Sequence, residues 1–89
     1  MQSEILPRAV ERLHLEDLEQ RRRVRRLVDG GDWACSNGDV ESLAHVARQL
    51  IADAPRAIQF DLVAVAELAS VDFLVASSRW SELSGRLRS

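Results

Sequence analysis

Apolar residues recur every three or four positions in the first part of the chain, which is the spacing of an amphipathic helix. The pattern predicts a helix over residues 7–28, where Pro7 suits the first turn and Asp29-Gly30-Gly31 favours a helix end. Residues 32–38 are rich in turn residues and predict a connection. Within it, Trp33-Ala34-Cys35 fits either a short helical turn or a short strand.

A second regular stripe predicts a helix over residues 39–54. Asp39 suits the N-cap, and Glu41 in the first turn complements the helix dipole. Pro55 ends the helix, because the residue before a proline is disfavoured in helical geometry. We therefore expect this helix and the next to pack antiparallel around Pro55.

The last third of the chain, residues 56–88, allows two interpretations. Its apolar residues step by three or four, and no Gly or Pro interrupts residues 56–84, which favours helix with a break near Ser77-Ser78. Residues 57–65, however, also alternate and are rich in Val, Ile and Phe, as a buried strand would be. A helix would then begin near Val71, capped by Ser70-Val71-Asp72.

Composition favours the helical interpretation. The chain has only four Gly and two Pro in 89 residues, fewer than a fold with many turns requires. We predict one all-α domain over residues 1–89, a bundle of three or four helices, with a truncated α/β domain as the alternative. Cys35 is the only cysteine, and we see neither a signal peptide nor a membrane span, so we expect a cytoplasmic protein of bacterial type.

The apolar load of residues 57–76 is unusually high. Fifteen of these twenty residues are apolar, and a helix of that composition needs cover on most sides. So small a domain cannot supply all of that cover, so we expect a partner protein or a second copy of the chain. The candidate partner-binding residues are large and apolar: Trp33, Phe60, Val63, Phe73 and Trp80.

Basic residues gather in the first predicted helix. Residues 1–28 hold seven Arg and five acids, whereas residues 29–89 hold five Arg and nine acids. A solvated helix face explains this cluster, because bases near a helix C-terminus complement its dipole. Acids also precede two of the arginines by four positions, in the pairs Asp17–Arg21 and Glu19–Arg23. A contact patch at Arg21, Arg22, Arg25 and Arg26 is the functional alternative, for an acidic protein or, less in keeping with the net charge of −2, for nucleic acid.

Part of the chain resembles tetratricopeptide-like helical hairpins. Gly38-Asp39-Val40, followed by Leu43, Ala47, Leu50-Ile51 and Pro55, is similar to the second helix of that repeat, and residues 78–83 echo residues 38–43. The resemblance covers residues 30–88. It implies a scaffold for protein interactions, such as a small chaperone or adaptor.

A rival resemblance, over residues 38–76, is to the STAS domains of anti-sigma-factor antagonists. Phe60-Asp61-Leu62, Val65, Leu68, Ser70 and Phe73 are similar to the strand and following helix start of that family. This resemblance implies a phosphorylation switch at Ser70, where Ala69 stands in place of the usual Asp and Asp72 in place of the usual Gly.

We find no pattern that predicts catalysis. One Cys and two distant His do not make a zinc site, and the acids around Gly30-Gly31 lack the spacing of a calcium-binding loop. We therefore expect no enzymatic activity, no cofactor, no metal and no small-molecule substrate. The function that we predict is a protein-interaction module, that is, a small chaperone, adaptor or regulatory subunit. A STAS-like switch and a nucleic-acid-binding regulator are the alternatives.

Overall fold

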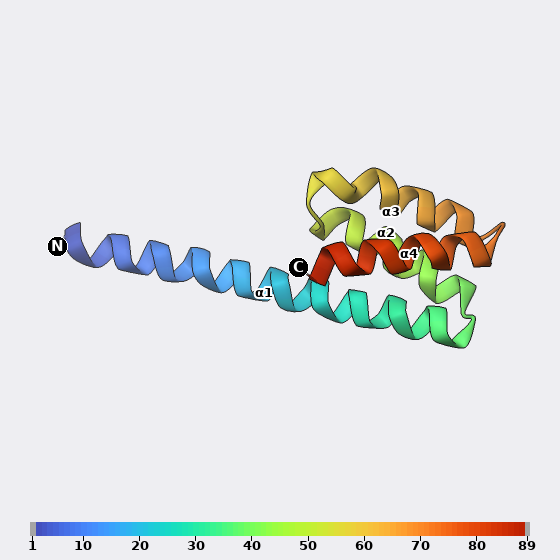
Figure 1. The fold of residues 1–89 in the computed structure, drawn as a ribbon. Coiled ribbons are helices and arrows are strands. Elements are labelled where there is room, and N and C mark those ends of the chain that lie inside the picture. Colours follow the sequence, from blue (N-terminus) through green and yellow to red (C-terminus); the bar gives the residue numbers. More distant parts are fainter. Residues whose placement is uncertain (1, 89) are drawn as a thin grey trace.

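The computed structural model describes the backbone of residues 2–88 and the side chains of residues 18–88 (Figure 1). Its elements are α1 (Gln2–Asn37), α2 (Val40–Asp53), α3 (Arg56–Ala69) and α4 (Phe73–Arg88). The predicted all-α fold is confirmed. The alternative strand over residues 57–65 is wrong, because these residues lie within α3, and no strand occurs in residues 2–88.

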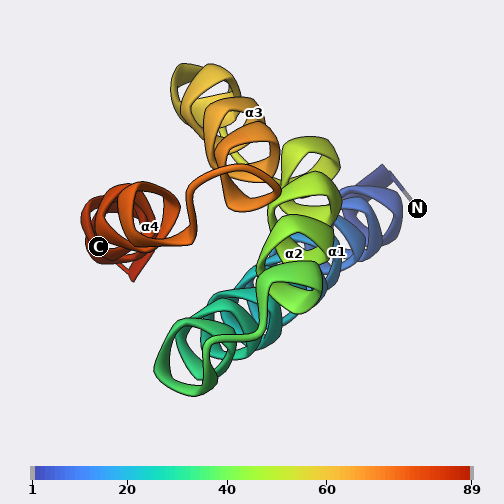
Figure 2. The same cartoon turned by 90° about the vertical axis from the view of Figure 1, so that its right-hand side faces the viewer.

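Successive helices run antiparallel and form hairpins, as expected for the pair around Pro55 (Figure 1). Viewed from the end, α1 and α3 each contact both α2 and α4, so the four helices enclose one core (Figure 2). Ala54 is extended, with ψ of 157°, as a residue before proline should be. Gln59 of α3 donates to the carbonyl oxygens of Ile51 and Ala54, which closes the turn between the two helices.

The core is built from residues that recur at helical spacing on each element, such as Leu43, Val46, Leu50 on α2 and Ile58, Leu62, Val65 on α3. Because each helix buries one stripe, the periodicity of the sequence and the packing agree. The largest fully buried side chains are Val28, Leu43, Leu50, Leu62, Val65 and Trp80.

The first helix does not end at Gly30-Gly31 as predicted. It continues to Asn37, and Trp33-Ala34-Cys35 lies inside it. Gly31 is a close-packing position instead, since a Cβ there would lie 2.1 Å from the Trp80 ring of α4. The residue that ends α1 is Gly38, whose positive φ of 65° is the conformation that glycine adopts at little cost.

Trp80 and Arg88 of α4 meet the same stretch of α1. The Trp80 indole N–H donates to Asp32 Oδ1 at 2.9 Å. Arg88 donates to Asp29 Oδ1 at 2.9 Å and to the second Asp32 oxygen. These carboxylates raise the pKa of the Arg88 guanidinium, which therefore stays charged. The first and last helices of the bundle are thus joined by both packing and hydrogen bonds.

The predicted break at Ser77-Ser78 is also wrong. The chain turns at residues 70–72, where the N–H groups of Val71 and Asp72 both donate to the Leu68 carbonyl. Asp72 then caps α4 by accepting from the Val75 N–H at 3.2 Å. Ser77 and Ser78 lie within α4, and the Ser77 hydroxyl donates to the Leu74 carbonyl one turn earlier. The long apolar segment is therefore two helices rather than one.

Asp39 caps α2 as predicted, and its carboxylate gives a testable pH dependence. It accepts from the Ser42 N–H at 3.1 Å and from the Ser42 hydroxyl at 2.7 Å, and these bonds hold the pKa of Asp39 below its ordinary value of 3.8. A depressed pKa stabilises the fold above pH 3.8, and this contribution is lost as the pH falls through the lower, folded-state pKa. We expect Asp39→Asn, which can cap but not titrate, to be less stable than the wild type at neutral pH. The difference between their urea midpoints should shrink in acid, and a constant difference would contradict the assignment.

Candidate interaction surfaces

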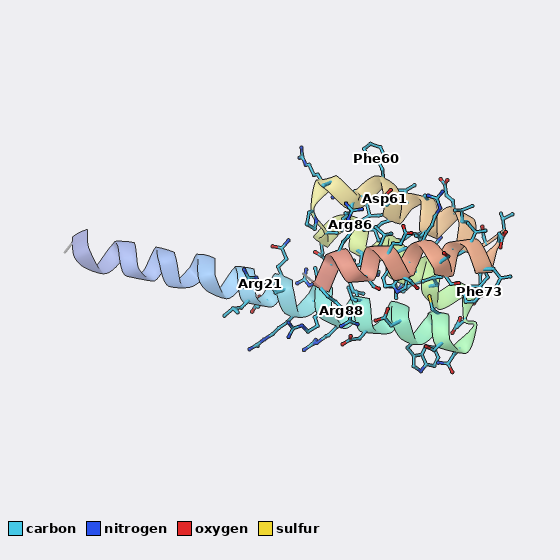
Figure 3. All side chains as sticks on the ribbon, viewed as in Figure 1. Arg21, Phe60, Asp61, Phe73, Arg86 and Arg88 are labelled. Atoms are coloured by element: carbon cyan, nitrogen blue, oxygen red, sulfur yellow. The ribbon has the colours of Figure 1, made fainter. Side chains whose placement is uncertain are left out.

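Several large apolar side chains lie in solvent on α3 and at the start of α4. Phe60 is 88% exposed and its ring points away from the bundle (Figure 3). Val71 and Leu74, at the turn between α3 and α4, are 86% and 80% exposed. Val63 and Val75 are also exposed. We call these five residues the α3–α4 apolar surface.

A shallow groove follows the outer face of α2. Trp33 of α1 lines one side, and Val63 and Ala66 of α3 line the other, while His45 and Arg48 lie on α2 between them. Trp33 is 57% exposed and so presents much of its indole to solvent. The structure therefore places Trp33 and Val63, which are thirty residues apart, along the same groove.

The five predicted partner-binding residues do not form one surface. Trp33, Phe60 and Val63 are exposed, but Phe73 is half-buried and packs against the core. Trp80 is 1% exposed, and a side chain that fills the core cannot contact a partner, so its assignment to a binding surface is corrected.

Sequence reasoning missed Val71, Leu74 and Val75. The predicted break at Ser77-Ser78 placed these residues inside one long helix, beside the apolar stripe rather than on it, and none of them was chosen as a contact. The helix start near Val71, capped by Ser70-Val71-Asp72, was predicted only together with the strand over residues 57–65, and the structure has this start without the strand.

The arginine segment separates into two groups in space. Arg21 and Arg25 line a concave site at the end of the bundle where α1 leaves it, whereas Arg22 and Arg26 do not line it. All four are exposed. Arg23 does not line the site but pairs at 3.4 Å with Asp53 of α2, which does. The sequence could not distinguish these arginines, because their surroundings come from the far end of the chain.

The concave site, here called the end pocket, combines an apolar floor with a basic rim. Arg86 and Arg88, from the last turn of α4, line the pocket together with Arg21 and Arg25 and form its basic rim. Figure 3 shows that Arg21 of α1 and Arg86 and Arg88 of α4 come from the same end of the bundle. Arg86 also pairs with Asp61 of α3 at 3.2 Å. Among the side chains of residues 18–88, Asp53 is the only acidic one that lines the pocket. Its floor consists of Val24, Val28, Ala54, Pro55, Ile58 and Leu87.

Ser70, the predicted phosphorylation site, lies at the end of α3 rather than after a strand. Its side chain is exposed, and its hydroxyl donates to the Glu67 carbonyl at 2.8 Å. The strand that the STAS resemblance requires is absent, so the structure gives no support to a switch of that type.

Cys35 is a free, partly buried cysteine on α1. Burial and the nearby Asp32 carboxylate raise the pKa of the Cys35 thiol, which keeps it protonated and weakly nucleophilic at neutral pH. Within residues 18–88, no three His, Cys, Asp or Glu side chains gather as metal ligands would.

Comparison with known proteins identifies no relative. No family model, no curated protein and no solved structure matches this chain. In the part of the chain that the structure describes, no helix has both the length and the apolar composition needed to cross a bilayer. Any functional proposal must therefore start from the bundle's own surfaces.

Proposed function

We propose that this protein is a protein-binding module, in the manner of a small adaptor, chaperone or regulatory subunit. The observation that supports the proposal is the exposure of Phe60, Val71 and Leu74, each at least 80%. The bundle already fills its core with the opposite faces of the same helices. These residues therefore add nothing to the interior of this chain, and their burial against a partner would be favourable.

The groove over α2 extends this surface toward α1. Val63 belongs both to the groove and to the α3–α4 apolar surface, so a partner seated on α3 would also reach Trp33. Fully burying a phenylalanine side chain contributes roughly 2 kcal/mol, and Trp is among the residues that most often dominate an interface. An apolar partner segment, such as one face of an amphipathic helix, fits this arrangement.

Replacing Phe60 with glutamate tests the proposal. Because Phe60 is 88% exposed, we expect Phe60→Glu to change the free energy of unfolding by less than about 0.5 kcal/mol. A photo-crosslinking amino acid at position 60 should capture a partner in cells of the source organism. The affinity of that partner for Phe60→Glu should fall at least about tenfold.

Ser78 provides the matched control, since it is exposed on α4 and outside the apolar surface. We expect no capture from position 78 and unchanged affinity for Ser78→Glu. Equal capture from both positions, or unaltered binding by Phe60→Glu, would contradict the proposal.

A further inference from the structure

The N-terminal part of α1 extends past the end of the bundle. The helix begins at Gln2, but the other three helices pack only along its C-terminal part (Figure 1). At 1.5 Å per residue, the backbone of residues 2–17 adds roughly 24 Å of helix. This segment has no other helix of the bundle packed along it, and most helical stability in proteins comes from such packing, so a partner that covered it would stabilise it.

The sequence of this segment is amphipathic and acidic. Leu6, Val10 and Leu13 recur at helical spacing. Residues 1–17 contain four acids and two arginines, a net charge of −2. The next stretch, residues 18–28, contains five arginines and one acid, a net charge of +4. Charge is therefore divided along one straight helix, acidic first and basic second.

The end pocket lies where these two parts of α1 meet. Its floor is apolar, and its rim carries Arg21 and Arg25, neither of which has an ion pair within the described side chains. The pocket is therefore complementary to an acidic amphipathic helix. The apolar face of such a helix could pack on the floor, and its acidic side chains could pair with the arginines of the rim.

We propose that two copies of this chain form an antiparallel dimer, in which residues 2–17 of each copy lie along α1 of the other and reach its end pocket. Antiparallel pairing places acidic segment on basic segment twice, whereas parallel pairing would place like charges together. The contact is two-fold symmetric and closes on itself, as in most homodimers. This interface does not involve the α3–α4 apolar surface, so it is independent of the proposed partner site.

Sedimentation of the purified full chain across the micromolar range tests the dimer. We expect the wild type to dimerise, and its dissociation constant to rise with salt. The pocket variant Arg21→Glu/Arg25→Glu should weaken the dimer at least about tenfold. The variant Glu4→Arg/Glu11→Arg should do the same from the other side of the contact. Combining the two variants should recover part of the lost affinity, because the exchanged positions again carry opposite charges.

The control variant is Arg22→Glu/Arg26→Glu. It makes the same charge change on the same helix, but neither residue lines the end pocket, so it should weaken the dimer less than the pocket variant. A monomeric wild type would overturn the proposal. So would a pocket variant that dimerises as tightly as the wild type, a control that weakens dimerisation equally, or a combined variant that dimerises no better than the pocket variant alone. Circular dichroism verifies that each variant remains folded.

Discussion

We expect Gly31→Ala to destabilise the bundle by about 2–3 kcal/mol, although alanine is the better helix former. An added Cβ at position 31 would lie 2.1 Å from Cζ2 and 2.5 Å from Cε2 of Trp80. That ring is 1% exposed and its N–H is held by Asp32, so it has no free space into which it can turn. The helices α1 and α4 would have to separate, which opens the core along their contact.

Gly30→Ala is the matched control, one residue earlier on the same helix. An added Cβ there would lie 3.6 Å from Val46 Cγ2, which is ordinary van der Waals contact. We expect Gly30→Ala to stabilise the protein by up to about 1 kcal/mol, through helix propensity and a less flexible unfolded chain. Urea unfolding followed by circular dichroism measures both variants. Equal effects at the two positions would show that Gly31 is not a packing position.

These two glycines also show where sequence reasoning stops. A Gly-Gly pair after a basic helical turn is a good local end signal, and it was interpreted as one. In the structure, α1 continues through both glycines, because Gly31 has no side chain and so allows Trp80 to pack closely. Trp80 is 49 positions further along the chain. Helix propensities depend on each residue type alone, so they cannot predict a contact between residues so far apart in the sequence. By contrast, the helix of residues 39–54 depends on signals within its own span, chiefly Asp39 and Pro55, and its prediction is confirmed.

The same distinction applies to the candidate surfaces. The high apolar content of residues 57–76 correctly indicated more apolar surface than the core uses. Which residues stay exposed, however, depends on where the chain turns, and that turn is set by Asp72 rather than by Ser77-Ser78. The end pocket was beyond sequence reasoning, because it brings Arg21 and Arg25 beside residues more than sixty positions away.

The largest loss of stability is expected for Trp80→Ala, about 3–5 kcal/mol. Trp80 is the largest fully buried side chain and belongs to the core shared by all four helices. Its removal leaves a cavity between α1 and α4 and deletes the hydrogen bond to Asp32 Oδ1. A domain of this size is stable by about 5–15 kcal/mol, so the loss is a large share of the total. Trp80→Phe keeps most of the ring volume without the N–H, and we expect it to cost less than half as much.

Combining Gly31→Ala with Trp80→Ala separates packing against the ring from other effects of the glycine. With the ring gone, a Cβ at position 31 no longer meets it, so Gly31→Ala should become neutral or slightly stabilising in the Trp80→Ala background. The coupling between the two positions should then be about 2–3 kcal/mol, as for residues in direct contact. This double-mutant cycle is measured in a background that carries Gly30→Ala and Gly85→Ala, which stabilise the protein. At Gly85 an added Cβ meets nothing within 4 Å. Additive effects would mean that the loss of stability in Gly31→Ala has a cause other than contact with Trp80. Strong coupling would show that α1 continues as a helix through both glycines because of its packing against α4, rather than because of the local sequence.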